Sequence, residues 1–464
     1  MNRKLILNDS ISLTADKSLF FDELSTLMWG FCGKVVKCTV TEGNSNEISI
    51  GTADAITLSE NDEYTVNVTE TGVKIVGRDK NCLMRGYMTF LMSLICEEPK
   101  DGVPVFTSEC TIIRGCFKVK NRMVHICIFP ETTYEMFRKI VRLCAVLQYT
   151  HIIIEFWGML KYDVLKELAW PFAFDKDKVK EVLEEAKAMG IIPIPMFNHF
   201  GHASQSRALN EKHVVLDQNP ALAYLFTPEG WAWDIESETV YKLLASIRKE
   251  LYELFGEGEY IHLGCDEAYI YSRDYVNQDI VAGFFGRITD ECVAEGRRPM
   301  LWGDMFICKA ELGGTDARYE CNAKSQENAE GIRKKLNKKT VINDWHYEVF
   351  ESPWKTAKKF SDEGFDTMVC PWFKTPNINS AAQTAKELNL FGTVQTTWHV
   401  LSACMPILYD AALASGLPIP RKLSYSSDGM ITAMLIRKIS FEPYDYEAAG
   451  SASHQIGNEY RNNS

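Results

Sequence analysis

Two adjacent acidic residues, Asp266 and Glu267, follow the apolar run Tyr-Ile-His-Leu-Gly at 260–264. Neighbouring carboxylates repel each other, and burial among aromatic side chains raises the pKa of at least one, which then stays protonated near neutral pH. Such a carboxyl can act as a general acid while the other stays charged and orients the substrate. An Asp-Glu pair is most often solvated surface, so its position after a buried run is what favours catalysis.

Other apolar runs also end in residues suited to binding. Four tryptophans, Trp302, Trp345, Trp372 and Trp398, occupy such ends, and flat indole faces stack on the C–H face of a pyranose ring. The alternative is that these rings only plug the top of a core. Further polar residues at or near run ends are candidate substrate ligands: Arg114, Glu155, Asn198, His202 just beyond a run, and Asp304.

The elements that must position these residues follow one repeated theme from Ile112 onward, in which a short apolar run is followed by an amphipathic helix. Eight runs are recognisable: Ile112–Val119, His151–Trp157, Ile191–Asn198, Tyr260–Glu267, Pro299–Met305, Thr340–Trp345, Thr367–Phe373 and Gly392–His399. Strands buried on both faces lose their alternation, and helices connect parallel strands. Eight such units predict a (β/α)8 TIM barrel, whose reactive groups sit at the C-terminal strand ends.

A doubly wound open sheet is the alternative fold. It favours a glycine fingerprint after its first strand, which Ile112–Val119 lacks. In the predicted barrel, the long loop from Phe200 to about Glu236 follows the third strand and carries Trp231 and Trp233. It therefore lies at the C-terminal end of the strands, where it can form a wall of the substrate site.

The first ~110 residues differ from the rest. Alternating residues at 64–68 and 73–76 flank Thr-Glu-Thr-Gly72, which indicates a hairpin, and apolar residues from Leu83 to Ile95 then recur at helical spacing. We therefore expect an N-terminal α+β domain at 1–108 and a catalytic barrel with a C-terminal covering segment at 109–464.

Composition restricts the partners. The formal charge is −12, so nucleic acid would require a local basic patch, and the sequence shows none. No run is long and apolar enough for a membrane span, and the N-terminus lacks the apolar stretch of a signal peptide. The 14 Cys lack regular spacing, which suits reduced thiols. We expect a cytoplasmic protein with a glycan substrate and no cofactor; the oligomeric state stays open, a homodimer included.

The segment His-Leu-Gly-Cys-Asp-Glu at 262–267, with Leu254-Phe255 before it, resembles the His-x-Gly-Gly-Asp-Glu signature of glycoside hydrolase family 20, the β-N-acetylhexosaminidases. Further matches fall in the same order: Arg114-Gly115, Pro195, Gly201-His202-Ala203, Trp302-Gly-Asp304, Trp345 and Trp398. The segment Asp62–Leu94 is similar to the domain that precedes the barrel in that family. The resemblance thus covers nearly the whole chain.

The resemblance implies removal of terminal GlcNAc or GalNAc by substrate-assisted catalysis. Glu267 would protonate the glycosidic oxygen. Asp266 would hold the N–H of the substrate's 2-acetamido group while the carbonyl oxygen of that group attacks the anomeric carbon. Arg114 would grip hydroxyls on the far side of the sugar, and His202 would couple to the acid, with Glu155 as an intermediary. Trp302, Trp345 and Trp398 would wall the acetamido pocket.

Three positions depart from the family pattern. The family places a Tyr after the seventh strand, where this chain has Cys-Pro-Trp-Phe-Lys at 370–374, and Tyr347 is the candidate replacement. Val400 stands where a Glu binds outer hydroxyls, and Asn198 stands where an acidic residue precedes Gly-His. These departures leave the choice between gluco and galacto substrates open.

Three other readings compete. A metal-dependent hydrolase is disfavoured because His199, His202 and His262 lack the spacing of a barrel metal site, so we expect no metal. A sugar-binding barrel without activity is conceivable from the departures, but both Asp266 and Glu267 are retained. A nucleophilic Cys265 is the third reading, although a lone cysteine in a strand usually serves packing.

Overall fold

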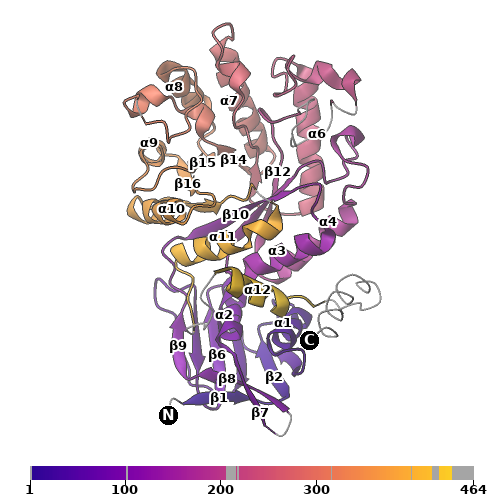
Figure 1. Ribbon diagram of the computed structural model, residues 1–464, viewed down its shortest axis with the longest axis vertical. Coiled ribbons are helices and arrows are strands. Elements are labelled where there is room, and N and C mark those ends of the chain that lie inside the picture. The colour runs from indigo at the N-terminus through magenta and orange to yellow at the C-terminus, as the bar shows by residue number, and fades with distance from the viewer. Residues whose placement is uncertain are drawn as a thin grey trace, which may run out of the picture.

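The computed structural model describes residues 3–100, 103–204, 216, 219–314, 316–398, 400–420 and 428–441. Two N-terminal β-sheets lie at one end of the molecule, and a β-barrel ringed by helices lies at the other (Figure 1). His399, at the end of the last predicted run, and the expected covering segment beyond 441 lie outside the described residues.

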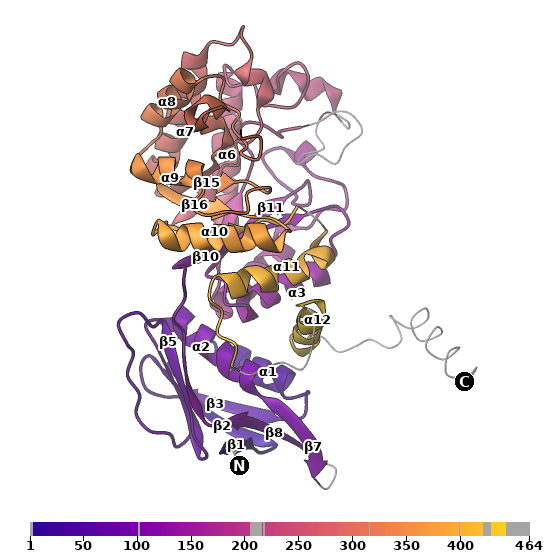
Figure 2. The same ribbon diagram turned by 60° about the vertical axis from the view of Figure 1, so that its left-hand side comes forward.

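The N-terminal part holds a six-stranded sheet, in the order β3-β2-β4-β6-β5-β9, and a three-stranded sheet, in the order β1-β8-β7. The strands are β1 Lys4–Leu7, β2 Ser10–Ala15, β3 Lys37–Glu42, β4 Glu47–Gly51, β5 Tyr64–Val68, β6 Gly72–Gly77, β7 Ile95–Lys100, β8 Val103–Glu109 and β9 Thr111–Arg114. Helices α1 (Phe21–Phe31) and α2 (Lys80–Ser93) lie between the sheets and the barrel (Figure 2).

The predicted hairpin and helix are confirmed as β5, β6 and α2. The two strands pair antiparallel from Tyr64 opposite Gly77 to Val68 opposite Val73. Asp79 caps α2, because its carboxylate accepts a hydrogen bond from the backbone N–H of Cys82. Nearly every residue of α2 is buried, which fixes the helix between the six-stranded sheet and the barrel.

Eight parallel strands close the barrel, with β10 paired to both β11 and β17. They are β10 Asn121–Ile128, β11 His151–Phe156, β12 Ile192–Met196, β13 Tyr260–His262, β14 Arg298–Trp302, β15 Val341–Trp345, β16 Asp366–Cys370 and β17 Gly392–Gln395. Met123 of β10, Ile153 of β11, Met300 of β14 and Met368 of β16 are buried in one cluster, which fills the interior as in a packed barrel core. The predicted TIM barrel is therefore confirmed.

The helices of the barrel are α3 Tyr134–Val146, α4 Lys176–Ala188, α6 Glu238–Phe255, α7 Gln278–Ala294, α8 Gln326–Lys335, α9 Lys355–Asp362, α10 Thr375–Glu387 and α11 Leu401–Ala414. Helix α12 (Asp428–Lys438) packs on α11 and α3, and its Lys438 donates to the carbonyl of Phe31 in α1. Helix α12 thus contacts both the barrel and the N-terminal part.

Seven of the eight predicted barrel strands are present, but the first was placed wrongly. Residues 111–114 form β9, which pairs with β5 at the edge of the six-stranded sheet, and the first barrel strand is β10. The apolar residues of β10 continue to Ile128, whereas the run that we expected is broken at Gly115. We therefore propose that the boundary between the two domains lies in the connection at 115–120 rather than at 108.

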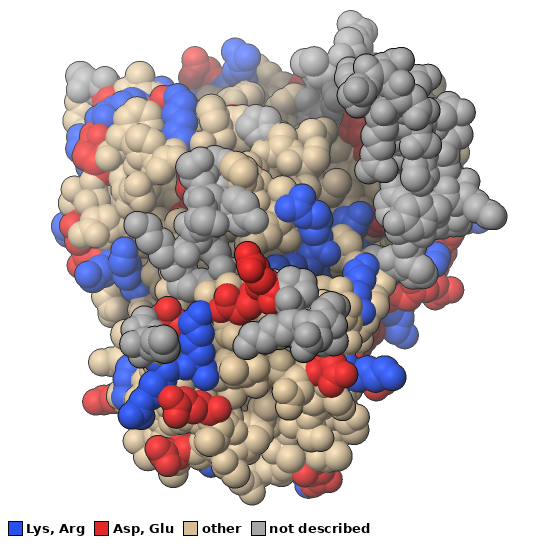
Figure 3. Space-filling model, turned by 60° about the horizontal axis from the view of Figure 1, so that its bottom comes forward, with Lys and Arg blue, Asp and Glu red and all other residues tan. Residues whose placement is uncertain are grey.

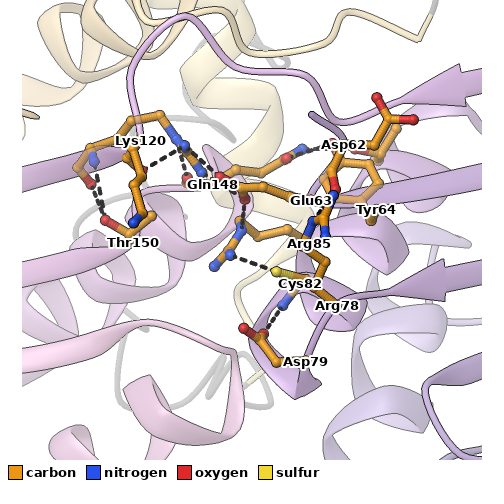
Figure 4. A network of polar contacts seen from close by, with 12 residues as sticks. Asp62, Glu63, Tyr64, Arg78, Asp79, Cys82, Arg85, Lys120, Gln148 and Thr150 are labelled. Atoms are coloured by element: carbon orange, nitrogen blue, oxygen red, sulfur yellow. Dashed lines mark hydrogen bonds and ion pairs between the residues drawn. The ribbon is translucent and has the colours of Figure 1, made fainter. Parts of the chain in front are cut away.

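A buried polar network joins the two parts (Figure 4). Glu63, just before β5, accepts hydrogen bonds from Arg85 of α2 at 2.7 Å and from Arg122 of β10 at 2.8 and 3.0 Å. The hydroxyl of Tyr64 lies 2.7 Å from the side-chain oxygen of Gln148. These contacts fix the N-terminal sheet against the start of the barrel.

The surface carries charges of both signs. On the face shown in Figure 3, Lys and Arg side chains alternate with Asp and Glu rather than gathering into a basic area. Among the residues that the structure describes, no helix is long and apolar enough to cross a membrane.

Candidate active site

A cavity of about 200 Å³ opens at the C-terminal ends of the barrel strands. It is lined by Trp157, His202, Asp266, Glu267, Trp302, Trp345, Tyr347, Trp372 and Trp398. The structure thus brings the predicted carboxylates and all four strand-end tryptophans into one site. Because they come from separate barrel segments, only closure of the barrel places them together.

The two carboxylates lie on a sharply bent segment that follows β13. Gly264 and Cys265 have φ angles of 65° and 77°, and Glu267 has a φ angle of 52°. A Cβ atom at Gly264 would lie 1.6 Å from the side-chain oxygen of Asn198, so this position requires glycine. Strained backbone of this kind is common where a side chain must be aimed into a site.

Glu267 is in direct contact with His202. The histidine Nε2 lies 2.9 Å from the Glu267 carboxylate and 3.6 Å from that of Asp266. Glu155 was expected to mediate this coupling, but the contact is direct. The His202 ring also packs on Trp231, with the ring centres 4.3 Å apart. The position of the predicted acid is therefore fixed by a polar contact and by an aromatic wall.

A third carboxylate, Asp304, lies behind the pair. It accepts hydrogen bonds from the backbone N–H of Glu267 at 2.9 Å, from Asn322 at 2.9 Å and from the indole N–H of Trp345 at 3.1 Å. Burial, and then repulsion from Asp266, raise the pKa of Asp304 to about 7. Asp304 was expected to bind substrate, yet the cavity lining does not include it; it holds the backbone of Glu267 and a wall of the site instead.

Aromatic rings form the rest of the cavity. Tyr347 lies between Trp345 and Trp372, with ring centres 5.1 and 5.2 Å away, and its hydroxyl accepts a hydrogen bond from the indole N–H of Trp398 at 2.6 Å. Burial raises the pKa of Tyr347 well above its ordinary value, so its hydroxyl keeps its proton. The tyrosine can therefore donate a hydrogen bond into the site.

A second polar layer lies deeper in the barrel. Glu155 accepts hydrogen bonds from Asn198 at 2.8 Å and lies 2.9 Å from the Nε2 atom of His125. Within the described part of the chain, His125, Cys127 and Glu155 are the one group of three potential metal ligands that lie within 4.8 Å of one another. These contacts engage both oxygens of Glu155, whereas the buried Nδ1 atom of His125 and Oδ1 atom of Asn198 have no hydrogen-bond partner among the described residues. Neither Glu155 nor Asn198 lines the cavity, where we expected substrate ligands.

Arg114 is not placed as we expected. It lies in β9, where its guanidinium contacts Asp62 at 2.5 Å and Ser59 at 2.9 Å, and its side chain is 45% exposed. Its predicted position at the start of a barrel strand is wrong, because the strand to which it belongs pairs with the N-terminal sheet.

Two cavity or near-cavity residues were not among the predicted ligands. Trp157 is the last residue of the predicted run His151–Trp157 and directly follows β11, so its position at a strand end was the available signal. Tyr269 hydrogen-bonds to the Glu267 side chain, but it belongs to a 3-10 turn at Tyr269–Ser272 that no periodicity indicates. By contrast Cys265 is buried and its pKa is raised well above the ordinary value, which agrees with a packing role.

In sequence, residues 166–406 match the family model of the catalytic domain of glycosyl hydrolase family 20. The chain belongs to this family. It is therefore a glycoside hydrolase, and its barrel with a preceding β domain is the family's fold. No curated protein sequence matches the chain.

Solved structures of family members share this fold at low identity. The exo β-N-acetylglucosaminidase of Vibrio harveyi, in complex with N-acetylglucosamine, has a TM-score of 0.65 at 13% identity and is matched over 94% of this chain and 74% of that one. The β-N-acetylhexosaminidase of Bacteroides fragilis has a TM-score of 0.63 at 15% identity, over 97% and 96% of the chains. A mutant Streptomyces plicatus β-hexosaminidase in complex with GlcNAc has a TM-score of 0.64 at 12% identity, and the match covers 96% of this chain and 94% of that one.

Proposed function

We propose that this family 20 enzyme is an exo-acting, retaining β-N-acetylhexosaminidase that removes terminal β-linked GlcNAc or GalNAc from glycans. The observation that carries the proposal is the Asp266–Glu267 pair inside a tryptophan-lined cavity, with His202 2.9 Å from Glu267. A cavity of about 200 Å³ suits one terminal sugar rather than a continuous chain, which supports exo action.

In the proposed reaction Glu267 is the general acid. It donates its proton to the glycosidic oxygen, and the leaving sugar departs with that proton. Asp266 accepts a hydrogen bond from the 2-acetamido N–H, so that the acetamido oxygen attacks the anomeric carbon and forms an oxazolinium ion. Glu267 then takes a proton from a water molecule, which opens this intermediate with net retention. The substrate supplies the nucleophile, so neighbouring residues on one segment suffice.

The aromatic wall would hold the acetamido group. Tyr347 is the proposed hydrogen-bond donor to the acetamido oxygen, in place of the tyrosine that the family carries after the seventh strand. Its protonated hydroxyl and its location in the cavity beside Trp345 and Trp372 support this role. Trp302 and Trp398, whose ring centres are 5.9 Å apart, would form the surface under the sugar ring.

The decisive experiment compares aryl glycosides. Wild-type enzyme should cleave aryl β-N-acetylglucosaminide or β-N-acetylgalactosaminide but not the plain β-glucoside, and EDTA should not change the rate. Glu267→Gln and Asp266→Asn should each lower kcat/KM by about 10² or more. Glu257→Gln, which changes an exposed glutamate outside the site, is the matched control. Cleavage of the plain glucoside, or loss of activity with EDTA, would contradict the mechanism.

We also propose that the enzyme acts in the cytoplasm on internalised or recycled glycan fragments. Its 14 cysteines are all free thiols, as is usual for proteins of reducing compartments. Cell fractionation with an activity assay tests this location, and recovery of the enzyme outside the cell would contradict it.

A further inference from the structure

The inner polar layer below the active-site cavity brings three potential metal ligands together. His125 and Cys127 stand two residues apart on β10, so their side chains point to the same face of the strand. Cys127 pairs with Glu155 in the parallel register of β10 and β11, which places the carboxylate beside the thiol. All three residues are buried, and none of them lines the cavity.

The distances between the three ligand atoms fit a tetrahedral zinc site. The Nε2 atom of His125 lies 2.9 Å from one carboxylate oxygen of Glu155, and the Sγ atom of Cys127 lies 3.6 Å from the same oxygen. Sγ and Nε2 are 3.8 Å apart. Zn–N and Zn–O bonds of about 2.0 Å and a Zn–S bond of about 2.3 Å place such atoms about 3.3 to 3.6 Å apart at tetrahedral angles. One ion can therefore contact all three atoms after small movements of the side chains.

The chemistry of the donor atoms selects the ion. Magnesium and calcium prefer oxygen ligands, whereas a sulfur, an imidazole nitrogen and a carboxylate oxygen together suit zinc. A thiolate and a carboxylate carry one negative charge each, which Zn²⁺ balances, and the imidazole binds as a neutral ligand. A site without net charge suits a buried position, because an uncompensated charge there would cost much free energy.

Two buried polar atoms of the same layer have no partner among the residues that the structure describes. They are the Nδ1 atom of His125 and the Oδ1 atom of Asn198, a residue that is 1% exposed. Asn198 belongs to the layer because its amide donates to the second oxygen of Glu155 at 2.8 Å. Buried polar atoms are normally hydrogen-bonded, so unpartnered ones indicate a bound ion or an ordered water molecule. The amide oxygen of Asn198 or a water molecule can supply the fourth ligand of a tetrahedral ion.

The layer lies directly under the aromatic wall of the active site. The ring centre of His125 lies 4.6 Å from that of Trp398 and 5.5 Å from that of Trp302. Both tryptophans line the cavity, whereas His125 does not. An ion held by His125 would therefore support this wall from below rather than contact the sugar.

We infer that His125, Cys127 and Glu155 bind one structural zinc ion, which fixes β10 to β11 below the active site. The expectation of no metal followed from His199, His202 and His262, which lack the spacing of a metal site. It did not include the His-x-Cys pair of β10, because the first barrel strand was expected at Ile112–Val119. The zinc ion takes no part in the proposed reaction, so the inference is independent of the proposed function.

Zinc content tests the inference. Enzyme produced in medium supplied with zinc and then dialysed against EDTA should retain about one zinc ion per chain by elemental analysis. EDTA removes an ion from the surface, but a buried ion should be released to a coloured zinc indicator only after denaturation. Wild-type enzyme produced with cobalt instead should show the near-ultraviolet charge-transfer band of a thiolate bound to Co²⁺.

Two variants and one control identify the ligands. Cys127→Ser and Glu155→Gln should each lower the retained zinc at least about five-fold. Cys370→Ser is the matched control, because Cys370 is also a buried thiol of a barrel strand but lies 3.8 Å from the carbonyl oxygen of Met368 and outside the layer. Wild-type enzyme that retains no zinc and shows no cobalt band, or Cys127→Ser enzyme that retains as much zinc as the control, would overturn the inference.

Discussion

Two carboxylates, the partly buried Glu63 at the junction of the domains and the fully buried Asp304 at the active site, lie in opposite electrostatic surroundings. Burial disfavours the charged form of Glu63, but the attraction of Arg122 and Arg85 outweighs it and lowers the pKa (Figure 4). Burial and the charge of Asp266 act in the same direction on Asp304 and raise its pKa to about 7. A paired carboxylate holds a structure together, whereas an unpaired one beside other acids keeps a proton near neutral pH.

The largest expected effect is on stability, at the junction. Glu63→Ala leaves Arg122 and Arg85 buried without their common partner, which should cost about 3–5 kcal/mol of the free energy of unfolding. Chemical denaturation measures this loss, with Glu257→Ala as an exposed control. The kcat of the remaining folded enzyme should be unchanged at low temperature, and a small loss of stability would show that the network matters little.

The next effect is on catalysis. Asp304→Asn replaces one of two acceptor oxygens by an NH2 group, which would face the N–H of Glu267 or of Trp345. We expect kcat to fall about 10- to 100-fold as the acid loses its position. Asp344→Asn is the matched control, because Asp344 is also buried at a strand end but bonds to His346 and Thr356. Equal losses of kcat in both variants would contradict a specific role of Asp304.

The two carboxylates should also respond oppositely to pH. The pKa of Asp304 is higher in the folded than in the unfolded chain, so the folded state binds more protons between pH ~4 and about 7. In this range the free energy of unfolding therefore falls as pH rises, by at most ~1.4 kcal/mol per pH unit. Glu63 has a lowered pKa, so its contribution is lost only on acidification below pH ~4.3. Melting temperatures of wild type and Asp304→Asn from pH 4 to 8 measure the first effect, and parallel curves would contradict it.

The smallest effect is expected at Arg114. Arg114 forms an ion pair with Asp62, and the side chain of Arg114 is 45% exposed. Because solvent weakens such a pair, Arg114→Ala should lower the free energy of unfolding by less than about 1 kcal/mol. KM for the aryl N-acetylglucosaminide should not change, because Arg114 lies in β9 rather than in the barrel. A rise in KM of ten-fold or more would contradict this prediction and indicate that Arg114 contacts the substrate.

The sequence was most informative where local pattern and burial coincide. Seven barrel strands could be predicted because strands buried on both faces are continuous apolar runs bounded by helices. The first barrel strand was predicted at Ile112–Val119, whereas the structure forms it at Asn121–Ile128, where the buried residues continue without a break. The pairing of β9 with β5 is a contact across about 45 residues, which no local signal reports.

The candidate site divides in the same way. The sequence by itself determined which side chains stand at the strand ends: Asp266, Glu267 and the four tryptophans follow apolar runs, and parallel strands must end at one face of a barrel. Only the tertiary structure decided what each side chain contacts. It turned Asp304 toward the backbone of Glu267, placed Glu155 and Asn198 below the cavity and brought Trp231 and Tyr269 to the acid. The physical reason is that strand position follows from local burial, whereas contacts across segments depend on loop conformation and on the packing of residues distant in the chain.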